Sequence, residues 1–336
     1  MTSLRRRRST RPPRRWTICS LDARTLVRRA ARPARRTPSA SIRSALRRAF
    51  WPALFIGPGL AVFLAFNTYP LVKALDISVR DWSVLPDAPS PFVGIKHYRE
   101  ALEDPIFWVA LRNTGLYALV TVPGQVALGL LVALGLNQIT RLRTLLRTLY
   151  YLPVVTSWVV VSLVFKFIFA GDAGLANVLL RDRLGVIPEY VSWLTQPVTA
   201  LLVVMLLGTW KGIGWTMIIF LAGLQGIPHE LLEAAALDGA GRWQRFRHIT
   251  LPLLRPATLF VLVMLLIGAF NVFISIYLLT GGKPLHQTEV LLTYMYQQAF
   301  DFLEFSYGAA ISYMLAAIVF ALSLVQLRVL RRPALA

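Results

Sequence analysis

Charged side chains are scarce in this sequence of 336 residues: they make up 15% of it, against about a quarter in ordinary soluble domains. Hydrophobic residues make up 56%, and the mean hydropathy is +0.58. This composition argues against a soluble enzyme. Cysteine is scarcer still, because Cys19 is the only one. A single thiol can form neither an internal disulfide nor a cysteine-rich zinc site.

Six stretches are long and apolar enough to cross a bilayer, which takes roughly 20 residues each. They are apolar around their whole circumference, as expected of helices that face lipid or other helices. Buried core helices of a large soluble protein are the alternative, but six stretches with almost no charges fit it poorly. The sequence therefore predicts an all-α membrane protein with six transmembrane helices, at approximately Pro52–Val72, Thr114–Leu136, Tyr150–Ala170, Val198–Gln225, Thr258–Thr280 and Tyr307–Leu327.

These six stretches contain no His, Asp or Glu, so they lack the paired catalytic groups that an intramembrane enzyme needs. The phosphate-binding loop G-x-x-x-x-G-K-[ST] is missing too, because the one Gly-Lys pair, at 282–283, is followed by Pro284. At 229–233 the sequence HELLE has Glu where a zinc-protease pattern requires its second His. We therefore expect no catalytic residue and no metal ligand in this chain.

Residues 1–50 form a basic segment with 16 Arg, no Lys and one acid. Because this segment has no apolar run, we predict a disordered cytoplasmic tail, followed by a membrane domain over residues 51–336. Three interpretations of the tail remain open: a solvated extension that touches anionic lipid, a targeting or wrongly assigned start segment, and a nucleic-acid-binding arm. We expect contact with membrane lipid and not with nucleic acid.

The other basic residues predict the orientation of the spans. With the N-terminus inside, segments 137–149, 226–257 and 328–336 are cytoplasmic, and they hold 10 of the 20 Lys and Arg residues outside the tail. The first outer loop, 73–113, has five bases against six acids. The positive-inside rule therefore favours both termini in the cytoplasm.

The cytoplasmic segment 226–257 carries the most informative pattern. A proline suits the start of its first helix, where two acids favour the positive end of the helix dipole. Gly239 and Gly241 can supply the left-handed backbone that ends this helix. A second short, basic helix, Arg242–His248, is expected to stop before Pro252. A DNA-binding helix-turn-helix is rejected because both ends of the segment enter the membrane within a few residues.

At these residues the sequence resembles the membrane permease subunits of binding-protein-dependent ABC importers. Their cytoplasmic signature reads E-A-A, three residues, G, nine residues, then I-x-L-P, and this chain fits every fixed position. The resemblance implies type I ABC importer architecture in the cytoplasmic membrane of a prokaryote, with a coupling helix in this loop that docks into a cleft of an ATPase subunit. We expect the coupling residues to be Glu233, Ala234, Ala235, Asp238, Gly239, Ala240, Ile249, Leu251 and Pro252.

The resemblance extends over most of residues 51–330 and points to the sugar-importer branch, in stretches such as FVGIKHYREAL, TLLRTLYYLPVV and IFLAGLQGIP. It is greatest to the first of the two permeases usually present, the type related to maltose and glycerol-phosphate importers. Two departures are the Arg-rich tail, which has no counterpart, and Lys283, which interrupts a common G-G-P.

The resemblance also implies partners: a second homologous permease, two ABC ATPase subunits and an extracytoplasmic solute-binding protein. ATP is then bound by the ATPase, and we expect no cofactor in this chain. The transported solute is expected to be a carbohydrate, moved by alternating access. A glycerol phosphodiester, a polyamine or a peptide is the alternative solute. A membrane anchor or signalling protein is a further alternative, but it leaves the cytoplasmic signature unexplained.

Polar residues inside spans cost free energy in hydrocarbon and therefore often line a pathway. Amides and aromatic rings suit uncharged, hydroxyl-rich solutes. The alternative is hydrogen bonding between helices, and the lysine can also snorkel or lie near a helix break at its neighbouring glycines. The candidate pathway residues are Gln125, Trp210, Lys211, Asn271 and Tyr277.

Overall fold

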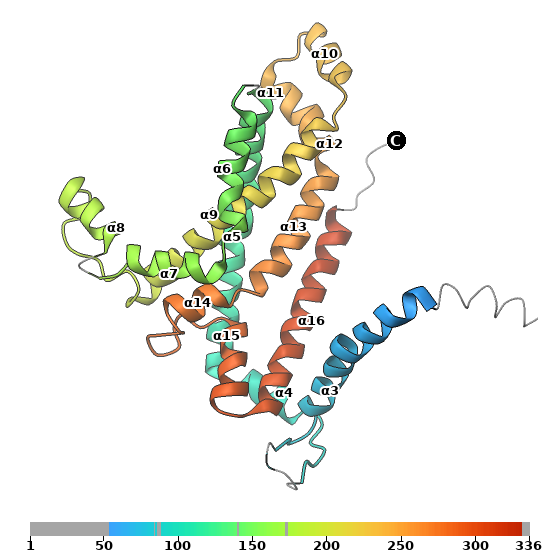
Figure 1. Cartoon of the computed structure of the whole chain (residues 1–336), viewed down its shortest axis with the longest axis vertical. Helices are drawn as coiled ribbons and strands as arrows, with labels where there is room; N and C mark the ends of the chain where they lie inside the picture. The colour runs from blue at the N-terminus through green and yellow to red at the C-terminus, as the bar shows by residue number, and fades with distance from the viewer. Residues whose placement is uncertain (1–53, 84, 86–88, 140, 172–173, 331–336) are drawn as a thin grey trace, which may run out of the picture. The chain divides into compact units, whose positions relative to one another are not determined.

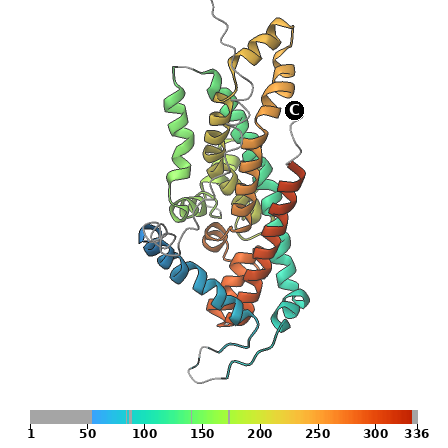
Figure 2. The same cartoon turned by 90° about the vertical axis from the view of Figure 1, so that its right-hand side faces the viewer.

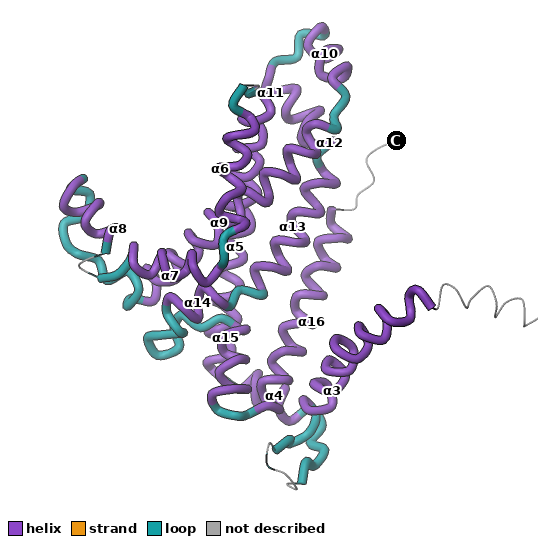
Figure 3. Tube along the Cα trace, in the orientation of Figure 1, coloured by secondary structure: helices purple, strands orange, loops and turns teal. Residues whose placement is uncertain are grey.

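The computed structural model describes residues 54–83, 85, 89–139, 141–171 and 174–330. The predicted tail, residues 1–50, lies outside the described residues. Within them the chain is helical and contains no β-strand (Figure 3). The chain divides into two units between Phe66 and Asn67, and the packing described below is that of the second unit.

Four long helices of the second unit are shown in Figure 1: α5 (Pro105–Gln138), α9 (Pro197–Gln225), α13 (Arg255–Phe270) and α16 (Phe305–Leu330). The shorter α-helices are α3 (Tyr69–Ser78), α4 (Lys96–Glu103), α6 (Arg143–Val155), α7 (Trp158–Ile168), α8 (Leu175–Asn177), α10 (His229–Leu237), α11 (Arg242–Arg245), α12 (Leu251–Leu253), α14 (Ile274–Leu279) and α15 (Leu291–Tyr296). The described residues also include the π-helical segments η1 (Leu64–Thr68), η2 (Val178–Arg183), η3 (Phe246–Thr250) and η4 (Gln297–Asp301).

Five helical segments of the described chain are long and apolar enough to cross a membrane: Leu54–Ser78, Pro105–Gln138, Pro197–Gln225, Arg255–Leu279 and Phe305–Arg328. They confirm five of the six predicted spans. The third predicted span, Tyr150–Ala170, is not one straight helix, because α6 and α7 meet at 92°. Together α6 and α7 pass the same test, so the described chain has five spans, or six if the bent pair counts as one.

Local chemistry explains the bend between α6 and α7. The backbone is extended at Thr156 and Ser157, with ψ angles of 147° and 136°. The Thr156 hydroxyl donates to the carbonyl of Pro153 at 2.7 Å. A side-chain hydroxyl that donates to a helix carbonyl competes with the backbone N–H groups that would otherwise bind it. Pro153 itself has no N–H and so cannot donate a backbone hydrogen bond. The helix therefore ends here inside the apolar stretch.

The fifth predicted span, Thr258–Thr280, contains a second break. α13 ends at Phe270 and α14 begins at Ile274. Asn271 lies at this break, and its side-chain amide donates to the carbonyl of Ile267 at 2.7 Å. The segment still qualifies as one span, so the predicted span is confirmed with an interruption that the sequence analysis did not place.

Glycines allow α9 to lie close to two other helices. A Cβ atom on Gly208 would lie 2.1 Å from the Tyr117 hydroxyl of α5, and one on Gly212 would lie 2.0 Å from the side-chain oxygen of Gln125, also in α5. Their four-residue spacing places both glycines on one face, as in close-packed membrane helices. Gly214 approaches α6 instead, where a Cβ would lie 2.2 Å from the carbonyl oxygen of Tyr150. α9 is thus fixed between α5 and α6.

Short helices lie at both ends of the long helices. α10, α11 and α12 lie at one end, and α4 and α15 at the other (Figures 1 and 2). At the second end the Asp104 carboxylate caps α5 by accepting from the Ile106 N–H at 2.8 Å. The same carboxylate accepts from the hydroxyls of Tyr307, at 2.8 Å, and Tyr294. Burial, aided by this carboxylate, raises the pKa of Tyr294 above its ordinary value. Asp104 therefore joins α5, α15 and α16.

We expect Gly214→Ala to destabilise the protein, because the added methyl group meets a backbone carbonyl of α6. The loss should be about 1–3 kcal/mol, as for overpacked cores, and should appear as a lower Tm in calorimetry of the detergent-solubilised chain. Gly135→Ala in α5 is the control, since nothing lies within 4 Å of its added Cβ. Equal losses in the two variants would contradict the close approach of α9 to α6.

Candidate functional site

The helix, tight turn and second helix predicted in segment 226–257 are confirmed as a folded elbow, residues 229–253. Its first helix, α10, follows Pro228 and ends at a Schellman motif. In this motif the Ala240 N–H donates to the Ala235 carbonyl at 2.9 Å, and the Gly239 N–H donates to the Ala236 carbonyl at 3.1 Å. Gly239 has φ +82°, the left-handed conformation that favours glycine. The signature glycine therefore has a structural reason, because it ends α10.

Two details of the predicted elbow are wrong. Gly241 is not left-handed: with φ −65° it caps α11, and its N–H is bound by the Gln244 side chain at 2.7 Å. The second helix does not stop before Pro252 but runs through α11, η3 and α12 to Leu253. The chain stays helical here because Pro252 stands at the start of α12, after the π-helical segment η3, where a missing N–H is tolerated.

The elbow presents apolar and acidic side chains to its surroundings. Leu237 at the end of α10 is 89% exposed, and Trp243 in α11 is 68% exposed. Glu233 and Asp238 are also exposed, and neither forms an ion pair within the described chain. Exposed large apolar residues with unpaired charges beside them are typical of a surface that binds another protein.

A hollow runs beside the turn of the elbow. Its lining is mostly of small or polar residues: Ala235, Asp238, Gly239, Ala240, Gln244, Arg245, His248 and Ile249. Of the predicted coupling residues, Ala234 and Leu251 are exposed and Pro252 is half-buried. Their docking role stays a prediction.

The elbow is anchored to the long helices at its C-terminal end. Thr250 and Leu254 are buried. Leu254 belongs to an apolar cluster with Phe220 and Leu224 of α9, and a Cβ on Gly223 would lie 2.9 Å from its side chain. A displacement of the elbow would therefore act on the end of α9 and the start of α13.

Three of the five predicted pathway residues line two adjoining cavities. Gln125 of α5 and Lys211 of α9 line a cavity of about 210 Å³ together with Tyr117 and Trp158. Asn271 lines a neighbouring cavity that shares Tyr117 and Trp158. Gln125 also donates to the carbonyl of Gly208 in α9 at 3.2 Å, so the predicted alternative of hydrogen bonding between helices applies to it as well.

The structure separates the other two pathway candidates from these cavities. Trp210 packs against Phe165, with 5.7 Å between ring centroids, and borders a groove on the α6 side. Tyr277 stacks on Phe273 at 5.3 Å and meets the edge of Tyr296 at 5.6 Å. Both rings are over 40% exposed.

Sequence reasoning missed a polar group in the second cavity. Ser275 is 1% exposed, and its hydroxyl has no hydrogen-bond partner among the described residues. It borders the same cavity as Asn271. An unpaired buried hydroxyl costs free energy, which a bound polar solute would relieve. A lone serine in an apolar run is too common to have been singled out from sequence.

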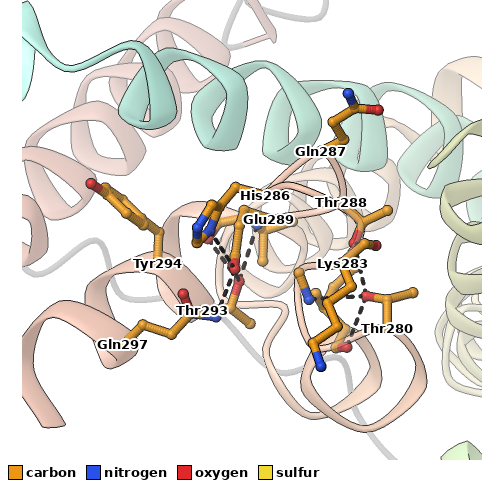
Figure 4. Close-up of polar contacts among 12 residues, drawn as sticks. Thr280, Lys283, His286, Gln287, Thr288, Glu289, Thr293, Tyr294 and Gln297 are labelled. Carbon is orange, nitrogen blue, oxygen red and sulfur yellow. Dashed lines mark hydrogen bonds and ion pairs between the residues drawn. The ribbon is translucent and has the colours of Figure 1, made fainter. Parts of the chain in front are cut away.

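Glu289 is the second missed residue, and it organises the loop before α15 (Figure 4). Its carboxylate is fully buried and accepts from Thr293 Oγ1 and Gln297 Nε2, each at 2.6 Å. His286 Nδ1 lies 3.4 Å from the same carboxylate. The only sequence signal is an acid directly before an apolar run.

Hydrogen bonds tie the same loop to α5. The Asn113 amide donates to the carbonyls of Gln287 and Glu289, at 2.8 and 2.9 Å. The Leu291 N–H donates to the Thr114 hydroxyl at 3.0 Å. This loop is therefore held in one conformation at the end of the molecule opposite to the elbow.

We expect Glu289→Ala to destabilise the protein, because the Gln297 amide would lose its carboxylate acceptor and the Thr293 hydroxyl would keep only the Val290 carbonyl. An unsatisfied buried donor costs about 1–3 kcal/mol, so the Tm measured by calorimetry should fall clearly. Glu304→Ala, which removes an exposed carboxylate, should leave the Tm nearly unchanged. An unchanged Tm in Glu289→Ala would contradict the anchoring role of this carboxylate.

Comparison with known proteins agrees with this architecture. The family model described as binding-protein-dependent transport system inner membrane component matches residues 125–333. The probable ABC transporter permease protein YurN of Bacillus subtilis is 39% identical over 279 residues, which cover 82% of this chain and 94% of the relative. The arabinooligosaccharides transport system permease protein AraP of Bacillus subtilis is 36% identical, over 87% of this chain and 93% of the relative. The lactose transport system permease protein LacF of Rhizobium radiobacter is 35% identical, over 84% and 96%.

A solved structure confirms the predicted fold. One chain of a bacterial ABC transporter involved in the import of the acidic polysaccharide alginate matches with a TM-score of 0.77 and 24% identity, over 88% of this chain and 99% of that chain. At this identity the likeness shows the fold, which is that of type I ABC permeases. The chain therefore belongs to the family of binding-protein-dependent transport system inner membrane components, and it is a multi-pass permease of the cell membrane.

Proposed function

We propose that this chain is the membrane-spanning subunit of an ATP-driven importer and that it translocates a carbohydrate by alternating access. The observation that carries the proposal is the elbow, which combines the importer signature with an exposed apolar end at Leu237. The relatives named for arabinooligosaccharide and lactose transport support a carbohydrate as the solute. The cavities bordered by Gln125, Asn271 and Ser275 supply amide and hydroxyl groups suited to such a solute.

The energy for transport comes from a separate ATPase subunit. The sequence contains no phosphate-binding loop of the G-x-x-x-x-G-K-[ST] type. This supports the proposal that ATP is bound and hydrolysed by the partner, and that this chain contributes neither catalysis nor a cofactor. Closure of the ATPase displaces the elbow, and the buried Leu254 passes the displacement to α9 and α13. Such coupling works only if the elbow makes different contacts with the ATPase in the two states.

The complete importer contains a second, homologous permease, two ABC ATPase subunits and an extracytoplasmic solute-binding protein. A binding protein is supported by the related alginate transporter, which was solved in complex with a periplasmic protein that holds an alginate pentasaccharide. The coupling residues within the elbow, above all Glu233, Asp238 and Gly239, contact the ATPase. The unpaired acids of α10 suit basic partners there, each pair contributing about 0–1 kcal/mol when exposed.

Gly239→Val tests the coupling role. Holding φ at +82° costs a β-branched residue roughly 1–2 kcal/mol. The backbone at the end of α10 should therefore change conformation. We expect the ATPase subunit to be lost when the permease is purified by an affinity tag from its native membrane, and uptake to fall with it.

Gly185→Val is the matched control. Gly185 has φ +63°, and neither glycine has an atom within 4 Å of an added Cβ. The two variants therefore carry the same backbone strain in different loops. Retention of the ATPase by Gly239→Val, or its equal loss from both variants, would show that the elbow is not the docking element.

Uptake measurements test the solute class. Cells that express the complete transporter should accumulate labelled di- or oligosaccharides, and unlabelled saccharide should compete. A glycerol phosphodiester, a polyamine and a peptide are the control solutes. Accumulation of one of these instead of every saccharide offered would contradict the carbohydrate assignment while leaving the ATP-driven permease intact.

A further inference from the structure

The break between α6 and α7 leaves carbonyl groups at the end of α6 without helical partners, and Lys211 binds two of them. Each α-helix leaves its last carbonyls without partners, and inside a membrane no water is available to satisfy them. The 92° bend places such a helix end within an apolar stretch. The Thr156 hydroxyl takes only the Pro153 carbonyl.

Lys211 reaches this helix end from α9. Its ammonium donates to the carbonyls of Pro153 at 2.6 Å and Thr156 at 2.7 Å, with Val154 at 3.5 Å. The side chain is 3% exposed. The partners lie 55 to 58 positions away in the sequence, so the contact joins two helices across the bend.

The charge of Lys211 is compensated without a carboxylate. In the described part of the chain its hydrogen bonds all go to backbone carbonyls, at the negative end of the α6 dipole. The ammonium also lies 4.9 Å from the ring centroid of Trp158, the first residue of α7. One ammonium thus contacts the end of α6, the start of α7 and the connection between them.

The same corner forms a wall of the cavity of about 210 Å³ that Gln125 lines, named the central cavity from here on. Lys211 and Trp158 both line it, together with Gln125 of α5. Gly214, one turn further along α9, lies against the Tyr150 carbonyl of α6. α9 and α6 are therefore in close contact next to the corner. The position of the cavity wall therefore depends on the corner that Lys211 holds.

We propose that Lys211 is a positioning residue for transport: its ammonium fixes the α6–α7 bend and with it the cavity wall through which the solute passes. This inference rests on the proposed transport function. It assigns Lys211 to the helix corner and not to the solute, because its donors are already bound by carbonyls.

Spin-label distances in the full-length chain test the bend directly. Labels are placed on Leu149→Cys in α6 and Phe167→Cys in α7, both exposed positions, after Cys19→Ser removes the native cysteine. We expect one narrow distance distribution in the parent and in Lys211→Arg. Lys211→Met, which keeps the apolar stem and removes the charge, should give a broad distribution.

Uptake is measured in the same variants. Lys211→Met should reduce the maximal rate about tenfold or more, the equivalent of losing one hydrogen bond to a charged group, while Lys211→Arg stays within about threefold of the parent because it restores the donors. Lys166→Met, an exposed lysine of α7, is the control and should change neither reading.

Each result decides the question. A narrow distribution in Lys211→Met, with or without loss of uptake, overturns the positioning role, and so does normal uptake despite a broad distribution.

If Lys211→Met does not accumulate in the membrane, Trp158→Leu is measured instead; intermediate broadening supports the proposal and an unchanged distribution overturns it. If the parent transports no saccharide, the proposed function fails, but the distances still show whether Lys211 fixes the bend.

Discussion

The structure depends on one constraint, that backbone N–H and C=O groups inside a bilayer must find their partners within the protein. A continuous helix such as α16 satisfies it on its own. The two interrupted segments satisfy it with side chains. At the first break the carbonyls are bound by Thr156 and Lys211, and at the second the Asn271 amide binds the Ile267 carbonyl. Polar residues within the spans are therefore structural before they are functional.

Close packing of the helices provides a route by which a displacement of the elbow could reach the cavity. Because α9 lies in close contact with α5 and α6 through its glycines, a displacement of α9 would act on both. The elbow is attached to the end of α9 through Leu254, and the central cavity is bordered by α5, α9 and α13. At the opposite end, Glu289 and Asp104 hold the loops in place. Elbow, helices and cavity thus form one continuous path.

Much of this organisation could be predicted from the sequence, because hydrophobic length and glycine chemistry are local properties. Five spans and the turn at Gly239 follow from them, and the structure confirms both. The bend in the third span was not predicted: it begins at Pro153 and Thr156, but the carbonyls at the break are bound by Lys211, 55 residues beyond Thr156. The burial of Glu289 likewise depends on partners from α15 and η4 that form only in the folded chain. Of the candidate pathway residues, those on facing helices were brought together and Trp210 and Tyr277 were not.

The central claim is that a separate ATPase drives this permease through the elbow. Cross-linking from Leu237→Cys, a position of α10 that is 89% exposed, tests it most directly in native membranes, with Cys19 replaced. The account predicts a cross-linked product that contains the ATPase subunit and whose yield changes when ATP is added. No such product, with or without nucleotide, while the same reagent still labels the cysteine at position 237, would contradict it.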